Sequence, residues 1–224
     1  MELYKSLGDV EGVASCFLSF SFINNRIANY PASLEQASNA LILFRQANSL
    51  DGMAQAYNNL GNIYDNMGNY KQSLHYYQKT LEIHSSSNNK SGLARVYINL
   101  SIIYNKTNKQ DEAEDLLNKA IEIGKETNDN RLLAVAYGNV GLMHDNAGDY
   151  KKALEYYTMS LELKTEMGDR HSIMISEINI ANTCLKLNQL AQALDHINTA
   201  IKIGNELGAK RELIDAFDIQ SQIY

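Results

Sequence analysis

The sequence predicts an all-α protein built as a solenoid of helix–turn–helix hairpins, and three observations predict it. Related segments recur every 40 residues without a gap. Each segment carries two stretches whose apolar residues are three, four and seven positions apart, and Gly or Asn stands between the stretches. Apolar residues at that spacing lie on one face of a helix. A single hairpin cannot bury such a face alone, so repeated hairpins are expected to stack.

The first helix of each repeat is predicted from four positions, which in the copy at 53–66 are Tyr57, Leu60, Gly61 and Tyr64. At about 100° per residue these positions cluster on one face of a helix. The corresponding residues in the other copies are Phe17, Phe20, Ser21 and Asn24, then Tyr97, Leu100, Ser101 and Tyr104, then Tyr137, Val140, Gly141 and His144, and finally Glu177, Ile180, Ala181 and Cys184.

The second helix of each repeat carries a small residue followed by a bulky one four positions later. These pairs are Ser73 with Tyr77, Ala113 with Leu117, Ala153 with Tyr157, and Ala193 with Ile197. Another small residue follows three positions on, which completes an apolar stripe at helical spacing. Each repeat is therefore predicted to be two amphipathic helices.

The turns are predicted from two columns that hold only Gly and Asn. Their members are Gly68, Asn108, Gly148 and Asn188 in one column, and Gly8, Asn48, Asn88, Asn128, Gly168 and Gly208 in the other. Both residue types enter the left-handed conformation at low cost, and that conformation commonly ends a helix. The next position is Asn69 or Asp149 in two repeats but Lys109 or Gln189 in two others, so the strength of the N-cap is expected to vary.

This pattern resembles the tetratricopeptide repeat, whose signature is an aromatic residue, Leu-Gly and Tyr in one helix and Ala with an aromatic residue in the next. The resemblance is strong at 52–168 and weaker at 12–50 and 172–208. The family's usual period of 34 residues is exceeded by six, which follow the last small residue of the second helix. Such long repeats resemble those of kinesin light chains and of bacterial peptide-sensing regulators and sensor kinases. The resemblance implies a right-handed superhelix and a protein or peptide partner.

The repeats predict one continuous array over residues 1–224. Its repeats are about 12–51, 52–91, 92–131, 132–171 and 172–211, with the tail of a preceding repeat at 1–11 and a partial repeat at 212–224. Leu3 falls in the column of Leu43, in a second helix, and Tyr224 falls in the column of Tyr64, in a first helix. We therefore expect the chain to be an excerpt from a longer protein.

Composition excludes several classes of function. A net charge of −6 and a pI near 5.4, without a basic cluster, argue against nucleic acid as a partner. No apolar stretch approaches the roughly 20 residues that a bilayer span requires, so direct membrane insertion is not expected. A cytoplasmic location is favoured, and a periplasmic sensor domain is the alternative.

No constellation of reactive residues is visible, so neither an enzyme, nor a cofactor, nor a metal site is predicted. His144 is expected to be a packed ring in the Tyr64 column. The remaining histidines, His75, His84, His171 and His196, are interpreted as surface residues. The two cysteines, Cys16 and Cys184, are expected to be free thiols, because a solenoid keeps distant repeats apart.

The first helices are expected to line a concave groove, through the stripe opposite their signature positions. The candidate groove residues are Gln55, Asn59, Asn62, Asn66, Arg95, Asn99, Ile102, Lys106, Val135, Asn139, Leu142, Asn146, Ile175, Asn179, Asn182 and Lys186. One column within this stripe is Asn in four successive repeats, at 59, 99, 139 and 179. A side-chain amide both donates and accepts, so it can bind the backbone of an extended peptide of any sequence.

The stripe also suggests what kind of ligand would fit. Ile102, Val135, Leu142 and Ile175 would supply an apolar floor. Positive charge would come from Arg26, Arg95, Lys106 and Lys186. A ligand with apolar side chains and acidic groups is therefore predicted. The alternative is that the asparagines bond between adjacent first helices and set the pitch of the stack.

The predicted function is that of a scaffold that binds a protein or peptide, as the interaction or sensing module of a larger signalling protein. The alternative is a self-association module, in which end repeats of different chains stack. Sedimentation at several protein concentrations separates the two, because stacking follows mass action.

Overall fold

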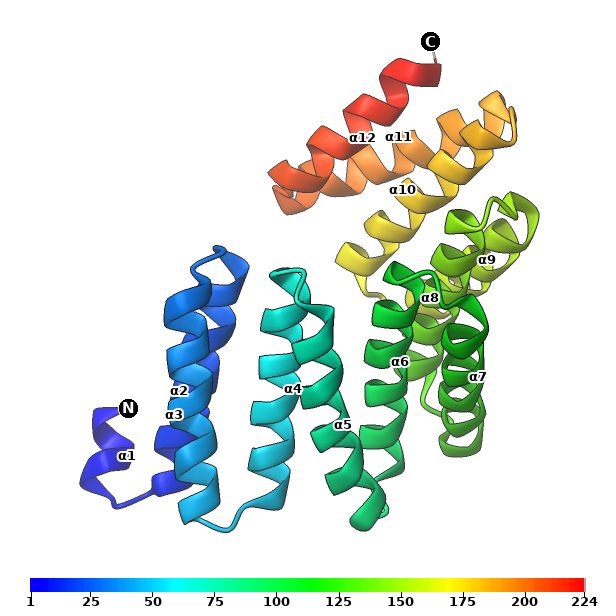
Figure 1. Ribbon diagram of the computed structural model, residues 1–224. Helices are drawn as coiled ribbons and strands as arrows, with labels where there is room; N and C mark the ends of the chain where they lie inside the picture. The colour runs from blue at the N-terminus through cyan, green and yellow to red at the C-terminus, as the bar shows by residue number, and fades with distance from the viewer. Residues whose placement is uncertain (224) are drawn as a thin grey trace. The chain divides into compact units, whose positions relative to one another are not determined.

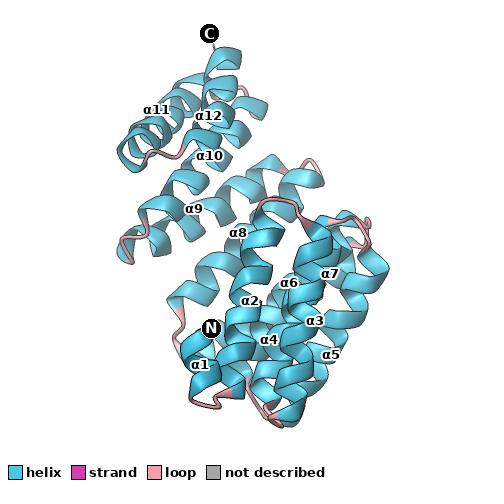
Figure 2. Cartoon of the chain, turned by 90° about the vertical axis from the view of Figure 1, so that its left-hand side faces the viewer, coloured by secondary structure: helices cyan, strands magenta, loops and turns pink. Residues whose placement is uncertain are grey.

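A computed structural model describes residues 1–223, apart from the side chain of residue 5, and its described residues are helices joined by short turns, without a strand (Figures 1 and 2). The all-α fold is confirmed, and the expectation for Tyr224 lies outside the described residues. The helices are α1 (Glu2–Ser6), α2 (Val10–Arg26), α3 (Tyr30–Gln46), α4 (Leu50–Asn66), α5 (Tyr70–Ser86), α6 (Lys90–Lys106), α7 (Gln110–Thr127), α8 (Asn130–Asn146), α9 (Tyr150–Glu166), α10 (Arg170–Lys186), α11 (Leu190–Leu207) and α12 (Lys210–Ile223).

The chain divides into two compact units, Met1–Thr107 and Asn108–Tyr224, which we call the first and the second unit. In the first unit α2 packs on α3 and α4 on α5, and these hairpins join through α3–α4, α2–α4 and α5–α6 contacts. In the second unit α8 packs on α9 and α10 on α11, joined through α7–α8, α9–α10, α11–α12 and α10–α12 contacts. The single array over 1–224 stays a prediction.

The turns follow the predicted columns. Every Gly and Asn of the two columns has a positive φ, between 50° at Asn88 and 81° at Gly148. Ala28, with a φ of 57°, adopts the same conformation, which its residue type did not predict. Its turn closes like the others, because the N–H of Ala28 donates to the Asn25 carbonyl and that of Asn29 to the Asn24 carbonyl. The fold of the repeat requires this turn, so Ala28 adopts a left-handed conformation that is strained for alanine.

The expected variation in N-caps is also confirmed. Asn69 Oδ1 accepts from the backbone N–H of Gln72 at 3.2 Å, and Asp149 Oδ1 accepts from that of Lys152 at 3.3 Å. Lys109 and Gln189 make no capping bond through their side chains. A side-chain cap of this kind stabilises a helix by about 1 kcal/mol.

Each hairpin packs a small residue of one helix against a large residue of the other. A Cβ atom built on Gly61 would lie 2.5 Å from the ring of Tyr77, and one on Gly141 would lie 2.6 Å from the ring of Tyr157. Where the second helix carries a smaller residue, Ile197, the first helix has room for a methyl group, and Ala181 packs there in the same core cluster. The glycines of the signature therefore make space for tyrosine.

Replacing Ala28 by Gly is expected to raise the free energy of unfolding by about 0.5–1 kcal/mol. Glycine relieves the left-handed strain, which costs alanine about 1–2 kcal/mol, and loses part of that gain to a more flexible unfolded chain. Urea denaturation followed by circular dichroism measures the change. Ala47, whose φ is −79°, supplies the matched control, because Ala47→Gly should lower stability.

Replacing Gly61 by Ala is expected to lower the free energy of unfolding by about 1–2 kcal/mol, because the new methyl group overlaps the Tyr77 ring. In a Tyr77→Ile background the same replacement should be neutral or stabilising, since alanine is the better helix former by about 1 kcal/mol. A double-mutant cycle measured by urea denaturation reports the coupling. Equal costs in both backgrounds would contradict the packing rule.

Candidate functional site

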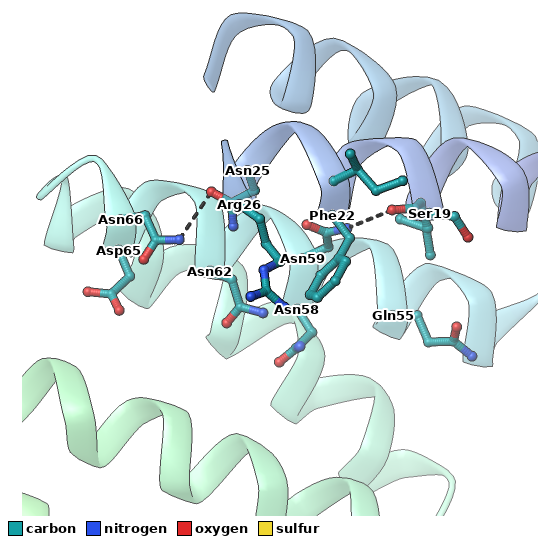
Figure 3. Close-up of a pocket in the computed structure, with 12 residues that line it drawn as sticks. Ser19, Phe22, Asn25, Arg26, Gln55, Asn58, Asn59, Asn62, Asp65 and Asn66 are labelled. Atoms are coloured by element: carbon teal, nitrogen blue, oxygen red, sulfur yellow. Dashed lines mark hydrogen bonds between the residues drawn. The ribbon is translucent and has the colours of Figure 1, made fainter. Parts of the chain in front are cut away.

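An open groove of about 810 Å³ lies between two first helices of the first unit, α2 and α4 (Figure 3). Four predicted residues line it, namely Gln55, Asn59, Asn62 and Asn66, and Arg26 joins them from α2. The lining residues that sequence reasoning missed are Leu18, Ser19, Phe22, Ile23, Asn25, Asn58 and Asp65.

The α2 wall of this groove is largely apolar and is open to solvent. Phe22 and Ile23 are neighbours in sequence and are each 55% exposed, so they form one apolar patch beside the groove. The guanidinium carbon of Arg26 lies 5.9 Å from the centre of the Phe22 ring, so the cation rests against the aromatic face. Figure 3 shows both side chains reaching from α2 toward the amides of Asn58 and Asn62. This wall can bury apolar groups beside one positive charge.

The α4 wall is a row of side-chain amides, some of which already link the two helices. Asn59 Nδ2 donates to the Leu18 carbonyl at 3.5 Å, and Asn66 Nδ2 donates to Asn25 Oδ1 at 3.1 Å. The side chain of Asn62 is held in place by the buried Tyr77 hydroxyl, which donates a 2.7 Å hydrogen bond to Asn62 Oδ1. That bond leaves the two N–H donors of Asn62 to the groove.

The asparagine column serves different purposes in the two units. In the first unit Asn99 Nδ2 donates to Asn58 Oδ1 at 2.8 Å and so ties α6 to α4. In the second unit Asn139 Nδ2 donates to the Val135 carbonyl of its own helix at 2.9 Å. Asn179 is half-buried on α10. The bond between adjacent first helices, which was the alternative interpretation of the column, is therefore present at Asn59 and Asn99.

The structure corrects the interpretation of two lysines as positive points for a ligand. Lys106 Nζ lies 2.7 and 2.9 Å from the carboxylate oxygens of Asp65, and Lys186 Nζ lies 2.6 Å from Asp145. Each lysine pairs with an aspartate 41 residues earlier, one repeat away on the neighbouring first helix. The sequence signal that could have found these pairs is that spacing. Among the predicted positive points, Arg26 and Arg95 have no carboxylate partner within residues 1–223.

The other predicted apolar residues are exposed, as a groove floor requires. Val135 and Leu142 on α8 are 44% and 41% exposed, Ile175 on α10 is 37% exposed, and Ile102 on α6 is half-buried. Arg95, Asn146 and Lys186 are exposed, and Asn182 is half-buried. That all of these residues form one groove stays a prediction, because they belong to two units.

A second, more polar cavity of about 320 Å³ lies between α4 and α6. Asp51, Asn58, His84 and Arg95 line it, and the His84 ring faces Gly92, where a Cβ would lie 2.6 Å away. Burial lowers the pKa of His84, so its imidazole is neutral around pH 7. The interpretation of His84 as a surface residue is corrected, since its side chain is half-buried in this cavity.

His144, His196 and Cys184 are packed within the fold, whereas His75 and His171 are exposed, as predicted. The His144 ring stacks on Tyr156 at 5.8 Å, as expected for a packed ring. His196, which was also interpreted as a surface residue, is half-buried, with its Nδ1 2.6 Å from Oε2 of buried Glu177. Cys184 is buried, and burial raises the pKa of its thiol.

No group of three or more His, Cys, Asp or Glu side chains within residues 1–223 could hold a metal ion. No helix there is long and apolar enough to cross a membrane.

A family model described as tetratricopeptide repeat matches residues 52–126 and 132–206. Both limits of the second match lie 80 residues after those of the first, so each match covers one repeat and most of the next. No curated protein matches the chain by sequence.

Several solved structures share the fold. A Rap protein complexed with competence and sporulation factor has a TM-score of 0.78 and 16% identity, over 92% of this chain and 63% of that one. NprR in complex with its cognate peptide NprX has a TM-score of 0.73 and 17% identity, over 91% of this chain and 59% of that one. A signal transduction ATPase with a tetratricopeptide repeat sensor from Pyrococcus horikoshii has a TM-score of 0.78 and 19% identity, over 97% of this chain and 33% of that one. The chain thus spans less than two thirds of each of these proteins.

Replacing Asn99 by Ala is expected to lower the free energy of unfolding by about 1 kcal/mol, because it removes the bond that joins α6 to α4. Asn139→Ala is the matched control from the same column. It should be neutral or slightly stabilising, since only a bond within α8 is lost and alanine favours the helix. Urea denaturation of both variants checks this, and equal losses would mean that the Asn99 bond adds nothing.

Proposed function

Because the chain belongs to the tetratricopeptide repeat family, we propose that it is a scaffold without catalytic activity that binds an extended peptide or a protein segment. The α2–α4 groove is the proposed binding site in the first unit. In this proposal the chain is the interaction or sensing module of a larger signalling protein. The predicted groove residues of α6 belong to the first unit, and those of α8 and α10 remain predicted binding residues of the second unit.

The observation that carries the proposal is the exposed pairing of an apolar wall with an amide wall in that groove. The side chains of Phe22 and Ile23 expose large apolar surfaces to water. Burying such surface stabilises a complex by roughly 25 cal/mol per Å². Opposite them Asn62 offers two N–H donors. An extended chain presents apolar side chains on one face and unpaired backbone carbonyls at its edge, so it satisfies both walls together.

The comparisons support the same proposal. Two of the similar folds were solved with a bound factor or cognate peptide, and a third contains a repeat sensor. At 16–19% identity this likeness concerns the fold, so the choice of ligand rests on the groove of this chain.

The charged residues of the groove indicate which chemical groups a ligand would carry. Asp65 is already paired with Lys106, whereas Arg26 is held only against the Phe22 ring. A ligand group that accepts hydrogen bonds, such as a carboxylate or a backbone carbonyl next to an aromatic or aliphatic side chain, would contact Arg26 and Phe22 at once. Lys106 is unavailable for this purpose.

The proposal is tested by binding of the wild-type chain to a random peptide array, followed by affinity measurements on the selected peptides. Phe22→Ala is expected to weaken binding about tenfold or more, because the groove loses its largest apolar contact. Phe20→Ala is the matched control, since Phe20 is 47% exposed on the same helix but does not line the groove. Circular dichroism checks that both variants keep their helices.

Peptide selection by the wild type, lost in Phe22→Ala and kept in Phe20→Ala, supports the groove. If the wild type selects no peptide, or if both variants bind as well as the wild type, the groove is not the binding site. Arg26→Gln then separates the ligand classes, because it should weaken only ligands that place an acceptor beside Phe22.

A further inference from the structure

The polar cavity between α4 and α6 is lined by two charged side chains of opposite sign, Asp51 on α4 and Arg95 on α6. Asp51 Oδ2 accepts a 2.7 Å hydrogen bond from Gln55 Nε2, but within residues 1–223 neither Asp51 nor Arg95 forms an ion pair. Burial lowers the pKa of His84, Asp51 raises it and Arg95 lowers it, so both charges lie close to this ring. A ligand with two opposite charges can therefore contact both residues at once.

The imidazole of His84 lies where the preceding repeat carries a buried phenyl ring. Phe44 is 2% exposed and packs over Gly52, where a Cβ would lie 2.1 Å from its ring. His84 packs over Gly92 in the same way, at 2.6 Å, but it is only half-buried and lines the cavity. Among the described residues neither nitrogen of the His84 ring has a hydrogen-bond partner. A neutral imidazole can therefore donate one hydrogen bond to a ligand and accept one from it.

The cavity has the size of a small polar molecule. Its volume of about 320 Å³ corresponds to roughly ten water molecules and stands at the low end of small-molecule sites, which span about 300–1,000 Å³. Ala54, Thr80 and Val96 are buried and form its inner part, whereas Asp51 and Arg95 are exposed. The charges therefore lie at the mouth of the cavity, and short side chains lie behind them.

We propose that this cavity binds a free amino acid with a short, polar and uncharged side chain. The ammonium group of the ligand pairs with Asp51, and its carboxylate pairs with Arg95. The ligand's side chain enters the inner part of the cavity and forms hydrogen bonds with His84 and with Ser91, whose half-buried hydroxyl has no partner among the described residues.

This site is distinct from the peptide groove of the proposed function. An internal residue of a peptide carries neither backbone charge, and a terminal residue carries only one, so only a free amino acid presents both charges to the cavity. Two residues line both hollows, Gln55 and Asn58, whereas Asp51, His84 and Arg95 line only this cavity. Binding here can therefore be measured without a peptide.

The test uses L-threonine and three compounds that each change one feature of it. N-acetyl-L-threonine lacks the positive charge, L-threonine amide lacks the negative charge, and L-valine has a methyl group in place of the hydroxyl. L-threonine is expected to shift the imidazole C–H signal of His84 in an NMR titration, with that signal assigned by its absence in His84→Phe. By calorimetry, the two blocked compounds should bind about tenfold or more weakly, and L-valine about fivefold more weakly.

His84→Phe puts the residue of the preceding repeat into this junction and is expected to abolish binding, because the phenyl ring fills space and forms no hydrogen bond with the ligand. Arg95→Gln is expected to weaken binding about tenfold or more, since the carboxylate loses its charged partner. His75→Gln, an exposed change on the same helix as His84, is the matched control and should leave the affinity unchanged. Circular dichroism checks that each variant keeps its helices.

The proposal is overturned if L-threonine leaves the His84 signal in place, if the two blocked compounds bind as tightly as L-threonine, or if Arg95→Gln binds like the wild type. Equal affinities for L-threonine and L-valine would overturn the choice of a polar side chain. Loss of binding in Arg95→Gln and in a folded His84→Phe, with binding kept in His75→Gln, supports the site.

Discussion

The close approach of two helices at a small residue is the constraint on which the rest of this structure depends. In the hairpin of α4 and α5 the Ser73 hydroxyl donates to the Gly61 carbonyl at 2.9 Å, and the Tyr77 ring fills the space that Gly61 leaves. The Tyr77 hydroxyl then donates to Asn62 Oδ1 and fixes the direction of its amide. A packing contact in the core thus determines which donors the groove presents.

The sizes of the packed residues also explain where titratable side chains lie between helices. Where one hairpin packs on the next, residues of a second helix face residues of the following first helix. His84 on α5 faces Gly92 on α6 in this way. Lys164 occupies the position of His84 in the matching repeat pair, next to the small residues Ser160 and Ser176. Since the partners at these junctions are small, a titratable side chain fits between helices without being sealed off. His84 and Lys164 are both half-buried at such junctions, whereas the His196–Glu177 pair lies inside the hairpin of α10 and α11.

The sequence predicted the helices, turns and caps well, because each depends on residues that are close along the chain. Asn69 and Lys109 revealed their capping ability by side-chain type alone. The sequence could not show the Lys106–Asp65 pair, because each residue looks like a solvated charge in its own column and only the stacking of helices brings them together. Ala28 was missed for a related reason, since its conformation is set by the register of the fold against the preference of the residue. His196 looked exposed because its partner, Glu177, stands where other repeats carry tyrosine.

The bonds that join neighbouring first helices in the first unit differ in kind from those that hold the hairpins together. The first helices are linked by side-chain amides and by an ion pair that is partly open to water, each worth at most about 1 kcal/mol. The hairpins are held by an apolar core cluster to which both kinds of helix contribute, with Leu41 and Phe44 from α3 and Ile63 from α4. In the first unit the polar links between first helices are therefore expected to break more readily than the contacts of the apolar core. A change in the width of the groove between α2 and α4 is expected to begin at these links, while the core keeps each hairpin together.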